Sequence, residues 1–233
     1  RKAYKKIADH VGLIPVVVIS PTDIDLISEG SLVRRKFLDR TISQSNKNYL
    51  NNLVTYHRIL QQRNALLKHF SSTNSFDKDT LSTYNEKIVQ FGNPIQESRK
   101  TFIKTFHPLF PTRYQFISGN HEPVSVSYDS KLVDRSFETL LEESLQKDRM
   151  LQYTSVGPHK DDLRFQINDF AIKKFGSQGQ QKTFLIALKL AQFDIIRNHM
   201  NVLPILLLDD IFDKLDDSRC LLYTSDAADD FTS

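Results

Sequence analysis

The feature that most constrains the fold is a short run without a single polar residue. Residues 205–208 (ILLL) follow Pro204 and end at two consecutive acids, Asp209 and Asp210. A strand that is apolar on both faces is typical of a central parallel strand covered by helices on each side, so the run predicts an α/β fold. For the two acids alone, a solvated loop or a helix cap is the alternative, but neither accounts for the apolar strand before them.

The place of the two acids favours a metal site. Open α/β sheets bind their ligands at the carboxyl ends of the strands. Adjacent carboxylates at such an end suit a hard divalent cation, one acid holding Mg²⁺ directly or through water and the other orienting an attacking water.

A second constellation lies upstream, in residues 174–181 (KFGSQGQQ). Small residues at Gly176, Ser177 and Gly179 let the backbone come close to a ligand, and a helix beginning near Gln180 aims its free N–H groups at an anion. A phosphate fits this position. Ser-x-Gly turns also open many helices that bind nothing, so the turn gains weight only from its context.

The context is the order of the parts along the chain. The turn is followed by an amphipathic helix, the strand with its two acids, and a short acidic loop at Leu215 and Asp216. This order resembles that of an ABC-type ATPase.

The charge distribution is typical of a protein with a polyanionic partner. Residues 1–208 carry 29 basic and 20 acidic residues, a net charge of +9, although the whole chain carries only +3. A basic body favours nucleic acid as the partner, while each basic cluster taken alone is equally typical of a solvated face. The candidate DNA-binding residues are Arg34, Arg35, Lys36, Lys173 and Lys174, with a further basic group at residues 1–6.

Composition also bears on the compartment. The chain has one Cys, no apolar run long enough to span a bilayer, and no signal-peptide pattern. We therefore expect a cytoplasmic protein that makes no membrane contact.

The periodicity predicts a sheet domain interrupted by a helical arm. A β-branched run at residues 16–19 predicts a buried strand, and residues 32–70 and 79–106 predict helices that form an antiparallel hairpin. Beyond Pro108 and Pro111, the pattern predicts a β-hairpin of residues 113–118 and 124–128, a helix at 136–151, and a second hairpin of residues 163–167 and 170–175.

A charged segment at residues 157–162 (GPHKDD) has two readings. His159 beside Asp161 and Asp162 would suit a metal site or a general base. Because neighbouring residues on an irregular loop rarely converge without help from elsewhere, a tight charged turn before a strand is the favoured reading.

Several segments together resemble a known family. They are residues 20–23 (SPTD), 30–31 (GS), 34–39 (RRKFLD), 62–68 (QRNALLK), 157–163 (GPHKDDL), 176–183 (GSQGQQKT), 207–212 (LLDDIF) and 215–216 (LD). In these segments the chain is similar to the RecF family of DNA replication and repair proteins, from about Tyr4 to Arg219.

The resemblance implies an ABC-type ATPase of the structural-maintenance (SMC) and Rad50 kind with a helical arm domain. Such a protein binds DNA, double-stranded or at a single-strand/double-strand junction. It is a weak, DNA-stimulated ATPase, forms ATP-dependent homodimers, and works with RecO and RecR in placing RecA at gaps and stalled forks. ATP and Mg²⁺ are the implied cofactors.

The resemblance also implies roles for individual residues. Ser177, Gln178, Gly179 and Gln180 would form the signature segment, which reaches the γ-phosphate of ATP held by the other subunit of the dimer. Asp209 would be the Walker B residue for Mg²⁺, and Asp210 the acid that polarises the attacking water. Leu215 and Asp216 would belong to the loop that joins the two active sites.

The chain departs from the family pattern at both ends. No G-x-x-x-x-G-K-[ST] phosphate loop occurs in it, and in the family this loop lies upstream of Arg1. We therefore expect an N-terminally truncated ATPase domain that neither binds ATP tightly nor hydrolyses it alone. Expected divisions are ATPase-domain residues 1–31, the arm at 32–110, ATPase-domain residues 111–219 with the signature and Walker B motifs, and a non-native tail at 220–233.

Two other functions stay open on the residues alone. A passive DNA-binding module would keep the arm and the basic surface but would not need Asp209 and Asp210. A metal-dependent nuclease would instead gather Asp161, Asp162, Asp209 and Asp210 around two cations.

Overall fold

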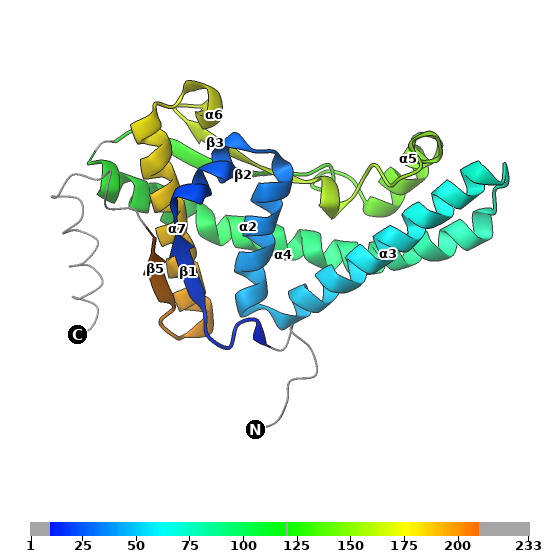
Figure 1. Cartoon of the computed structure of the whole chain (residues 1–233), viewed down its shortest axis with the longest axis horizontal. Coiled ribbons are helices and arrows are strands. Elements are labelled where there is room, and N and C mark those ends of the chain that lie inside the picture. Colours follow the sequence, from blue (N-terminus) through cyan, green and yellow to red (C-terminus); the bar gives the residue numbers. More distant parts are fainter. Residues whose placement is uncertain (1–9, 120, 210–233) are drawn as a thin grey trace.

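The computed structural model describes residues 10–119 and 121–209. A sheet-containing body stands at one end, and a long helical hairpin projects from it (Figure 1). Within the described ranges, no helix is long and apolar enough to cross a membrane.

Helices make up most of the described chain. A single turn of 3-10 helix, η2 (Pro21–Ile24), leads into the one-turn helix α1 (Asp25–Ser28). The long helices are α2 (Ser31–Ser45), α3 (Lys47–Ser72), α4 (Lys78–Ser118), α5 (Phe137–Leu151) and α7 (Gln178–Met200). Two further short elements, η3 (Pro158–Lys160) and α6 (Ile172–Phe175), precede β3 and α7 respectively.

The strands form two small sheets. In the first, β1 (Val16–Ile19) pairs in parallel with β5 (Ile205–Leu208), with Ile19 opposite Leu208. In the second, β2 (Val124–Asp129) pairs antiparallel with β3 (Asp162–Ile167), which also pairs with the short β4 (Phe170–Ala171). The β3–β4 turn at Asn168 and Asp169 has two left-handed residues, as a tight hairpin requires.

The arm confirms the predicted helical hairpin. Asn46 ends α2 and caps α3, its side chain accepting a hydrogen bond from the Tyr49 backbone N–H, so the chain turns sharply there. Asp77 caps α4 in the same way after the polar stretch that follows α3. The two helices then run side by side along the projection (Figure 1).

The prediction of a strand at residues 113–118 is wrong, because this segment is the last part of α4. The sequence pattern predicts that the helix ends at Pro108 and Pro111, yet both lie inside it. The helix persists because Phe106, Phe110 and Tyr114 form one buried face, and Phe110 packs against Phe184 of α7 at 4.6 Å between ring centroids. Packing outweighs the hydrogen bonds that proline removes.

The second predicted hairpin is right only in part. Residues 170–171 pair with β3 as expected, but residues 172–175 form α6 rather than a longer strand. Ile172 is buried while Lys173 and Lys174 are exposed, so one helical turn carries the chain from the sheet to α7.

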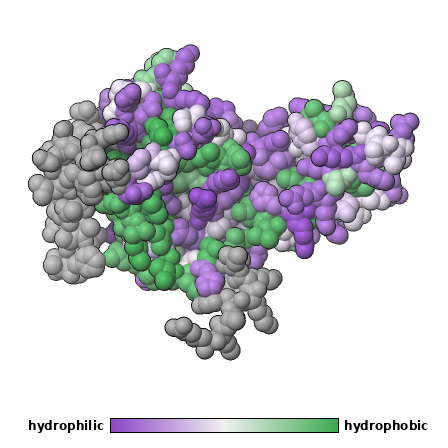
Figure 2. All heavy atoms as spheres, in the orientation of Figure 1, coloured by the Kyte–Doolittle hydropathy of each residue, from purple (hydrophilic) through white to green (hydrophobic). Residues whose placement is uncertain are grey.

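The expectation that residues 205–208 are covered on both faces is wrong for the described residues. Leu206 and Leu208 pack against the core, but Ile205 is 48% and Leu207 49% exposed. On the neighbouring β1, Val18 is 42% exposed. Figure 2 shows the continuous hydrophobic area that results over β1 and β5.

A buried arginine joins the arm to the sheet. Arg99, on α4, is almost fully buried and donates hydrogen bonds to Asp39 on α2 (2.7 Å), Tyr49 on α3 (3.0 Å) and Asp161 before β3 (3.0 Å). Burial lowers the pKa of this guanidinium, but the opposing effect of Tyr49 and Asp39 is larger, so the net shift of the pKa is upward. The group is therefore a permanent cation between two carboxylates.

We predict that Arg99→Met lowers the free energy of unfolding by about 3–5 kcal/mol, because it leaves the buried carboxylate of Asp161 without its cation. The measurement is urea unfolding followed by circular dichroism. Arg164→Met is the matched control, since Arg164 pairs with Asp129 on the surface and should cost less than about 1 kcal/mol. Equal losses in the two variants would contradict the structural role of Arg99.

Candidate functional site

Residues 177–180, the signature turn, start α7 in a well-ordered cap. The Ser177 hydroxyl accepts a hydrogen bond from the Gln180 backbone N–H at 3.2 Å, and the Gln180 side chain accepts one from the Ser177 backbone N–H at 2.8 Å. This reciprocal capping box fixes the first turn of the helix. Ser177, Gln178 and Gly179 are exposed, so the positive end of the α7 dipole faces outward.

A residue that the sequence did not single out holds the turn in place. Glu122, between α4 and β2, accepts hydrogen bonds from the Gln180 side chain and from the Tyr114 hydroxyl, both at 2.9 Å. Burial raises the pKa of Tyr114, and its bond to Glu122 adds to the shift. Nothing in the local pattern marks Glu122, because the contact depends on α4 continuing beyond Pro111.

The two glycines of the turn have different surroundings. A Cβ added to Gly176 would lie 2.6 Å from Ile172 Cγ1 and 2.8 Å from the Ile172 carbonyl oxygen, so this glycine is required by packing within the chain. Among the described residues, a Cβ added to Gly179 would find only Ser177 Oγ, at 4.0 Å. The space above Gly179 is thus open to a ligand or a second molecule.

The carboxyl end of β5 carries the predicted metal ligand. Asp209 donates its backbone N–H to the carbonyl oxygen of Ile19 at 2.9 Å, which continues the pairing of β5 with β1, and the residue is exposed. An exposed carboxylate at a strand end has the oxygen donors that Mg²⁺ prefers. Asp210, Leu215 and Asp216 lie outside the described residues.

The signature turn and Asp209 do not meet within one chain. Lys189, near the middle of α7, donates a hydrogen bond to the carbonyl oxygen of Val18 at 2.9 Å, close to the point where Asp209 follows β5. Ser177 is 12 residues earlier on the same helix, which corresponds to about 18 Å along the helix axis at the α-helical rise. The two predicted halves of the site are therefore far apart in this molecule.

The loop at residues 157–162 is a buried network. The His159 ring bonds through Nδ1 to the Tyr56 hydroxyl at 2.7 Å and through Nε2 to the Thr154 carbonyl oxygen at 3.0 Å. Because a carbonyl oxygen only accepts, Nε2 carries the proton, Nδ1 is the acceptor, and the Tyr56 hydroxyl donates. Burial lowers the pKa of His159 to about 4, so the ring is neutral at pH 7.

The acids of this loop are each matched with a cation. Asp161 accepts from Arg99 and from the Tyr128 hydroxyl, and Asp162 forms a two-pronged ion pair with Arg34 at 2.7 and 2.9 Å. Among the described residues, no group of three or more acids, histidines or cysteines could hold a metal ion. The favoured reading, a charged turn before a strand, agrees with this geometry, and the nuclease alternative is not favoured.

The five basic candidates differ in what they contact. Arg34 also bonds to the carbonyl oxygens of Leu26 and Glu29, and Lys173 donates to the Ser28 carbonyl oxygen. Arg35 donates to the Asp161 carbonyl oxygen. Lys36 is exposed, and the Lys174 ammonium lies 5.2 Å from the Phe175 ring centroid. Their assignment to DNA binding stays a prediction.

Comparisons with known proteins agree in sequence and in fold. No family model matches the chain. The DNA replication and repair protein RecF of Flavobacterium johnsoniae is 56% identical over 218 residues, and that of Phocaeicola vulgatus 46% over 220; each match covers 94% of this chain. The chain spans 61% and 58%, respectively, of the length of these relatives.

Two solved structures have the same fold. The recombination mediator protein RecF with ATPrS, described as part of the RecFOR pathway, gives a TM-score of 0.87 at 31% identity and covers 95% of this chain and 62% of its own. The same mediator with ATP gives 0.86, also at 31% identity, and covers 93% and 60%.

The sheet, the helical arm and the turn at the start of α7 together define an α/β protein with the ABC-type ATPase fold. Within this class, the sequence comparison and the structure comparison both match RecF proteins, the sequence comparison over 94% of the chain. The chain belongs to the RecF family.

The two glycines of the turn give a paired prediction. Gly176→Ala should lower the free energy of unfolding by about 1–3 kcal/mol, because its Cβ meets backbone that cannot move freely. Gly179→Ala should leave it unchanged or raise it by up to about 1 kcal/mol, because alanine favours the helix and finds open space. Thermal unfolding of the two variants checks this, and a destabilising Gly179→Ala would show that the space above the turn is filled.

We further predict that stability falls as the pH drops from 6.5 to 4. In this range the unfolded chain protonates His159, with an ordinary pKa near 6.5, while the folded chain does not. Between pH 7 and 4.5 this group should cost about 2.5 kcal/mol. Urea unfolding of the parent chain and of His159→Gln at both pH values measures the effect. Equal losses in both proteins would refute it.

Proposed function

We propose that the chain belongs to an ATP-dependent DNA-binding protein of recombinational repair and replication restart. Its two subunits would close on ATP, held between the Walker A loop of one subunit and the signature turn of the other. The solved relatives bind ATP or ATPrS by their own descriptions, which supports ATP as the ligand.

One observation carries this proposal. The signature turn is exposed at the start of α7, with open space above Gly179 among the described residues, and precedes by about 18 Å of helix Lys189, whose side chain reaches the carboxyl end of β1 beside β5. Two halves of one phosphate site that are this far apart in a chain can complete each other only between two molecules.

The residues present suit the ligands that the proposal requires. The free N–H groups at the start of α7 suit a γ-phosphate, and Asp209 has the hard oxygen donors for Mg²⁺. When bound, the ion would neutralise charge on the phosphates. Asp210 would polarise the attacking water, and Leu215 and Asp216 would connect the two sites. The arm and the basic residues would bind DNA in the cytoplasm, with RecO, RecR and RecA as partners.

The test uses the whole protein and mixes two inactive variants. Ser177→Arg blocks the signature turn and Asp209→Asn removes the metal ligand, so each homodimer should lose ATP turnover. A mixed dimer has one site with both halves intact, and an equimolar mixture should therefore recover about a quarter of the parent activity, as expected for statistical pairing in a two-fold dimer. Asp134→Asn, an exposed carboxylate outside the site, is the control.

The outcomes separate the candidate functions. Recovery in the mixture requires sites shared between subunits. If neither variant recovers activity when mixed, the site lies within one chain and the proposal fails. If the whole protein binds DNA equally with and without ATP and has no turnover, the passive DNA-binding module is the correct account.

A further inference from the structure

A small pocket lies at the base of the arm, where α2 meets α3, α4 and η3. Its volume is about 210 Å³, and the polar residues that line it are Arg35, Lys36, Asp39, Tyr56, His57, Arg99 and His159. Four of these residues, Arg35, Lys36, Asp39 and His159, come from two of the segments that resemble the RecF family, 34–39 and 157–163, for which the proposed ATP site has no use.

The charge of this pocket is positive. Arg35, Lys36 and Arg99 contribute three cations to the lining, and Asp39 is the single acid. The Asp39 carboxylate already accepts from Arg99 and from the Tyr49 hydroxyl. Arg99 is shared between Asp39 and Asp161, so these three groups together carry a charge of −1, and Arg35 and Lys36 bring the sum to +1.

The Arg35 guanidinium has N–H donors available for a ligand. Its guanidinium makes one hydrogen bond within the described part of the chain, from Nη1 to the Asp161 carbonyl oxygen. A guanidinium has five N–H donors in a fork that matches phosphate oxygens. Partial burial, and then the nearby charge of Arg99, lower the pKa of Arg35, while Asp162, Asp161 and Asp39 oppose this shift.

The two imidazoles in the lining, those of His57 and His159, have different roles. Both ring nitrogens of His159 are occupied by Tyr56 and Thr154, so this residue forms a neutral wall. His57 packs edge-on against the Tyr56 ring, and burial lowers its pKa, with Arg99 and Arg35 adding to the shift while Asp39 opposes it. An anion beside His57 would favour its protonated form and so gain a third donor.

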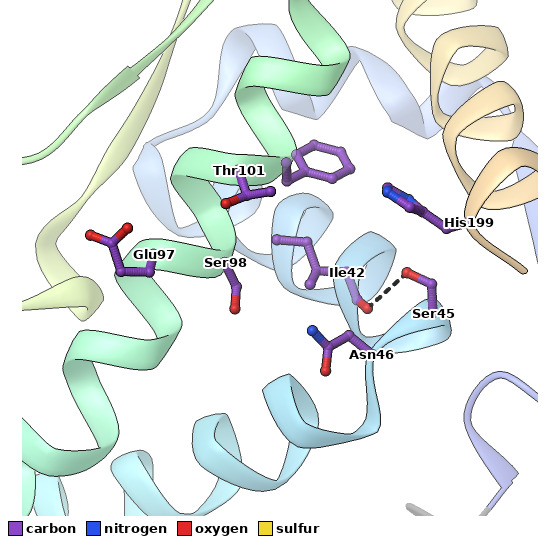
Figure 3. A pocket seen from close by; sticks show the side chains of 8 residues that line it. Ile42, Ser45, Asn46, Glu97, Ser98, Thr101 and His199 are labelled. Atoms are coloured by element: carbon purple, nitrogen blue, oxygen red, sulfur yellow. Dashed lines mark hydrogen bonds between the residues drawn. The ribbon is translucent and has the colours of Figure 1, made fainter.

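A larger pocket nearby lacks these properties. It measures about 380 Å³ and lies between α2, α4 and α7 (Figure 3). Its ionisable residues, Glu97 and His199, stand at opposite sides, and Glu97 pairs with Lys100. The Ser45 and Ser98 hydroxyls bond to backbone carbonyl oxygens. Its described lining therefore has no excess of cations for an anion.

We propose that the pocket at the base of the arm binds one phosphate group of the DNA backbone, held by Arg35, Lys36 and His57. This rests on the proposed function in one respect, that DNA is the source of the phosphate. Pockets for drug-sized ligands measure about 300–1,000 Å³, so this one suits a phosphate rather than a whole nucleotide. Arg34 is excluded from the contact, because its Nε and Nη2 donate to Asp162 and its Nη1 donates to the carbonyl oxygens of Leu26 and Glu29.

The first experiment titrates the chain with inorganic phosphate and follows the imidazole resonances of His57 and His199 by NMR. We expect His57 to shift and His199 to stay unchanged, with chloride at equal ionic strength as the salt control. Lys36→Gln should abolish the shift. Because Lys36 is exposed, this variant should fold, and its thermal unfolding checks that. No shift at His57 would overturn the proposal.

The second experiment measures duplex DNA binding by the whole protein at several salt concentrations. Lys36→Gln, which removes one phosphate contact, should weaken binding to all DNA sequences by about 5–10-fold. It should also reduce by about one the slope of log affinity against log salt concentration. Lys147→Gln, an exposed lysine on α5 with the same change of charge, should lose less than about twofold.

The two experiments together separate the outcomes. Equal losses of DNA affinity in Lys36→Gln and Lys147→Gln would overturn the proposed phosphate pocket and favour non-specific electrostatic attraction. A His57 shift with unchanged DNA binding in Lys36→Gln would overturn DNA as the source and leave a site for free phosphate. If the parent protein binds no DNA, the proposed function fails, whereas a shift at His57 would still support the phosphate pocket.

Discussion

The buried cation of Arg99 holds the arm and the sheet together. It bonds at once to α2, to α3 and to the loop before β3, so three segments far apart in sequence depend on one guanidinium. A second buried pair, Arg63 with Asp148 at 2.8 Å, ties α3 to α5 in the same manner. Such pairs add little net stability over apolar packing, but they are intolerant of a missing partner. They therefore define one relative placement of these elements, and the pocket with Arg35, Lys36 and His57 exists because of that placement.

The same rigidity explains how the chain presents the signature turn. The capping box, the bonds of Glu122 to Gln180 and Tyr114, and the close packing at Gly176 all fix the first turn of α7 before any ligand is present. Donors that are fixed in advance bind an anion without an ordering cost. In the proposed dimer, affinity for the second subunit would then depend on how the nucleotide completes the site.

Local patterns in the sequence predicted the elements whose stability is local. The strand 16–19, the helix pair of the arm, the helix 136–151 and the turn at Ser177 follow from apolar periodicity and capping residues. The partner of β2 could not be predicted, because it is β3, some forty residues later, and the helix at residues 113–118 depends on packing against Phe184. Of the site, Ser177 and Asp209 were marked by sequence. Glu122 and His57 were not, because their roles arise only when distant segments meet.

The length of α4 has a mechanical consequence. Its 41 residues correspond to about 60 Å of helix. The helix runs from the far tip of the arm to the segment that packs against α7. A tilt of about 5° at one end therefore displaces the other by about 5 Å. Pro94, Pro108 and Pro111 leave the carbonyls four residues before them without their helical partners, and bending stiffness is lowest at these points. The helix thus transmits a tilt over its whole length and bends most easily at its three prolines. Two of these, Pro108 and Pro111, lie beside the segment that supports the signature turn.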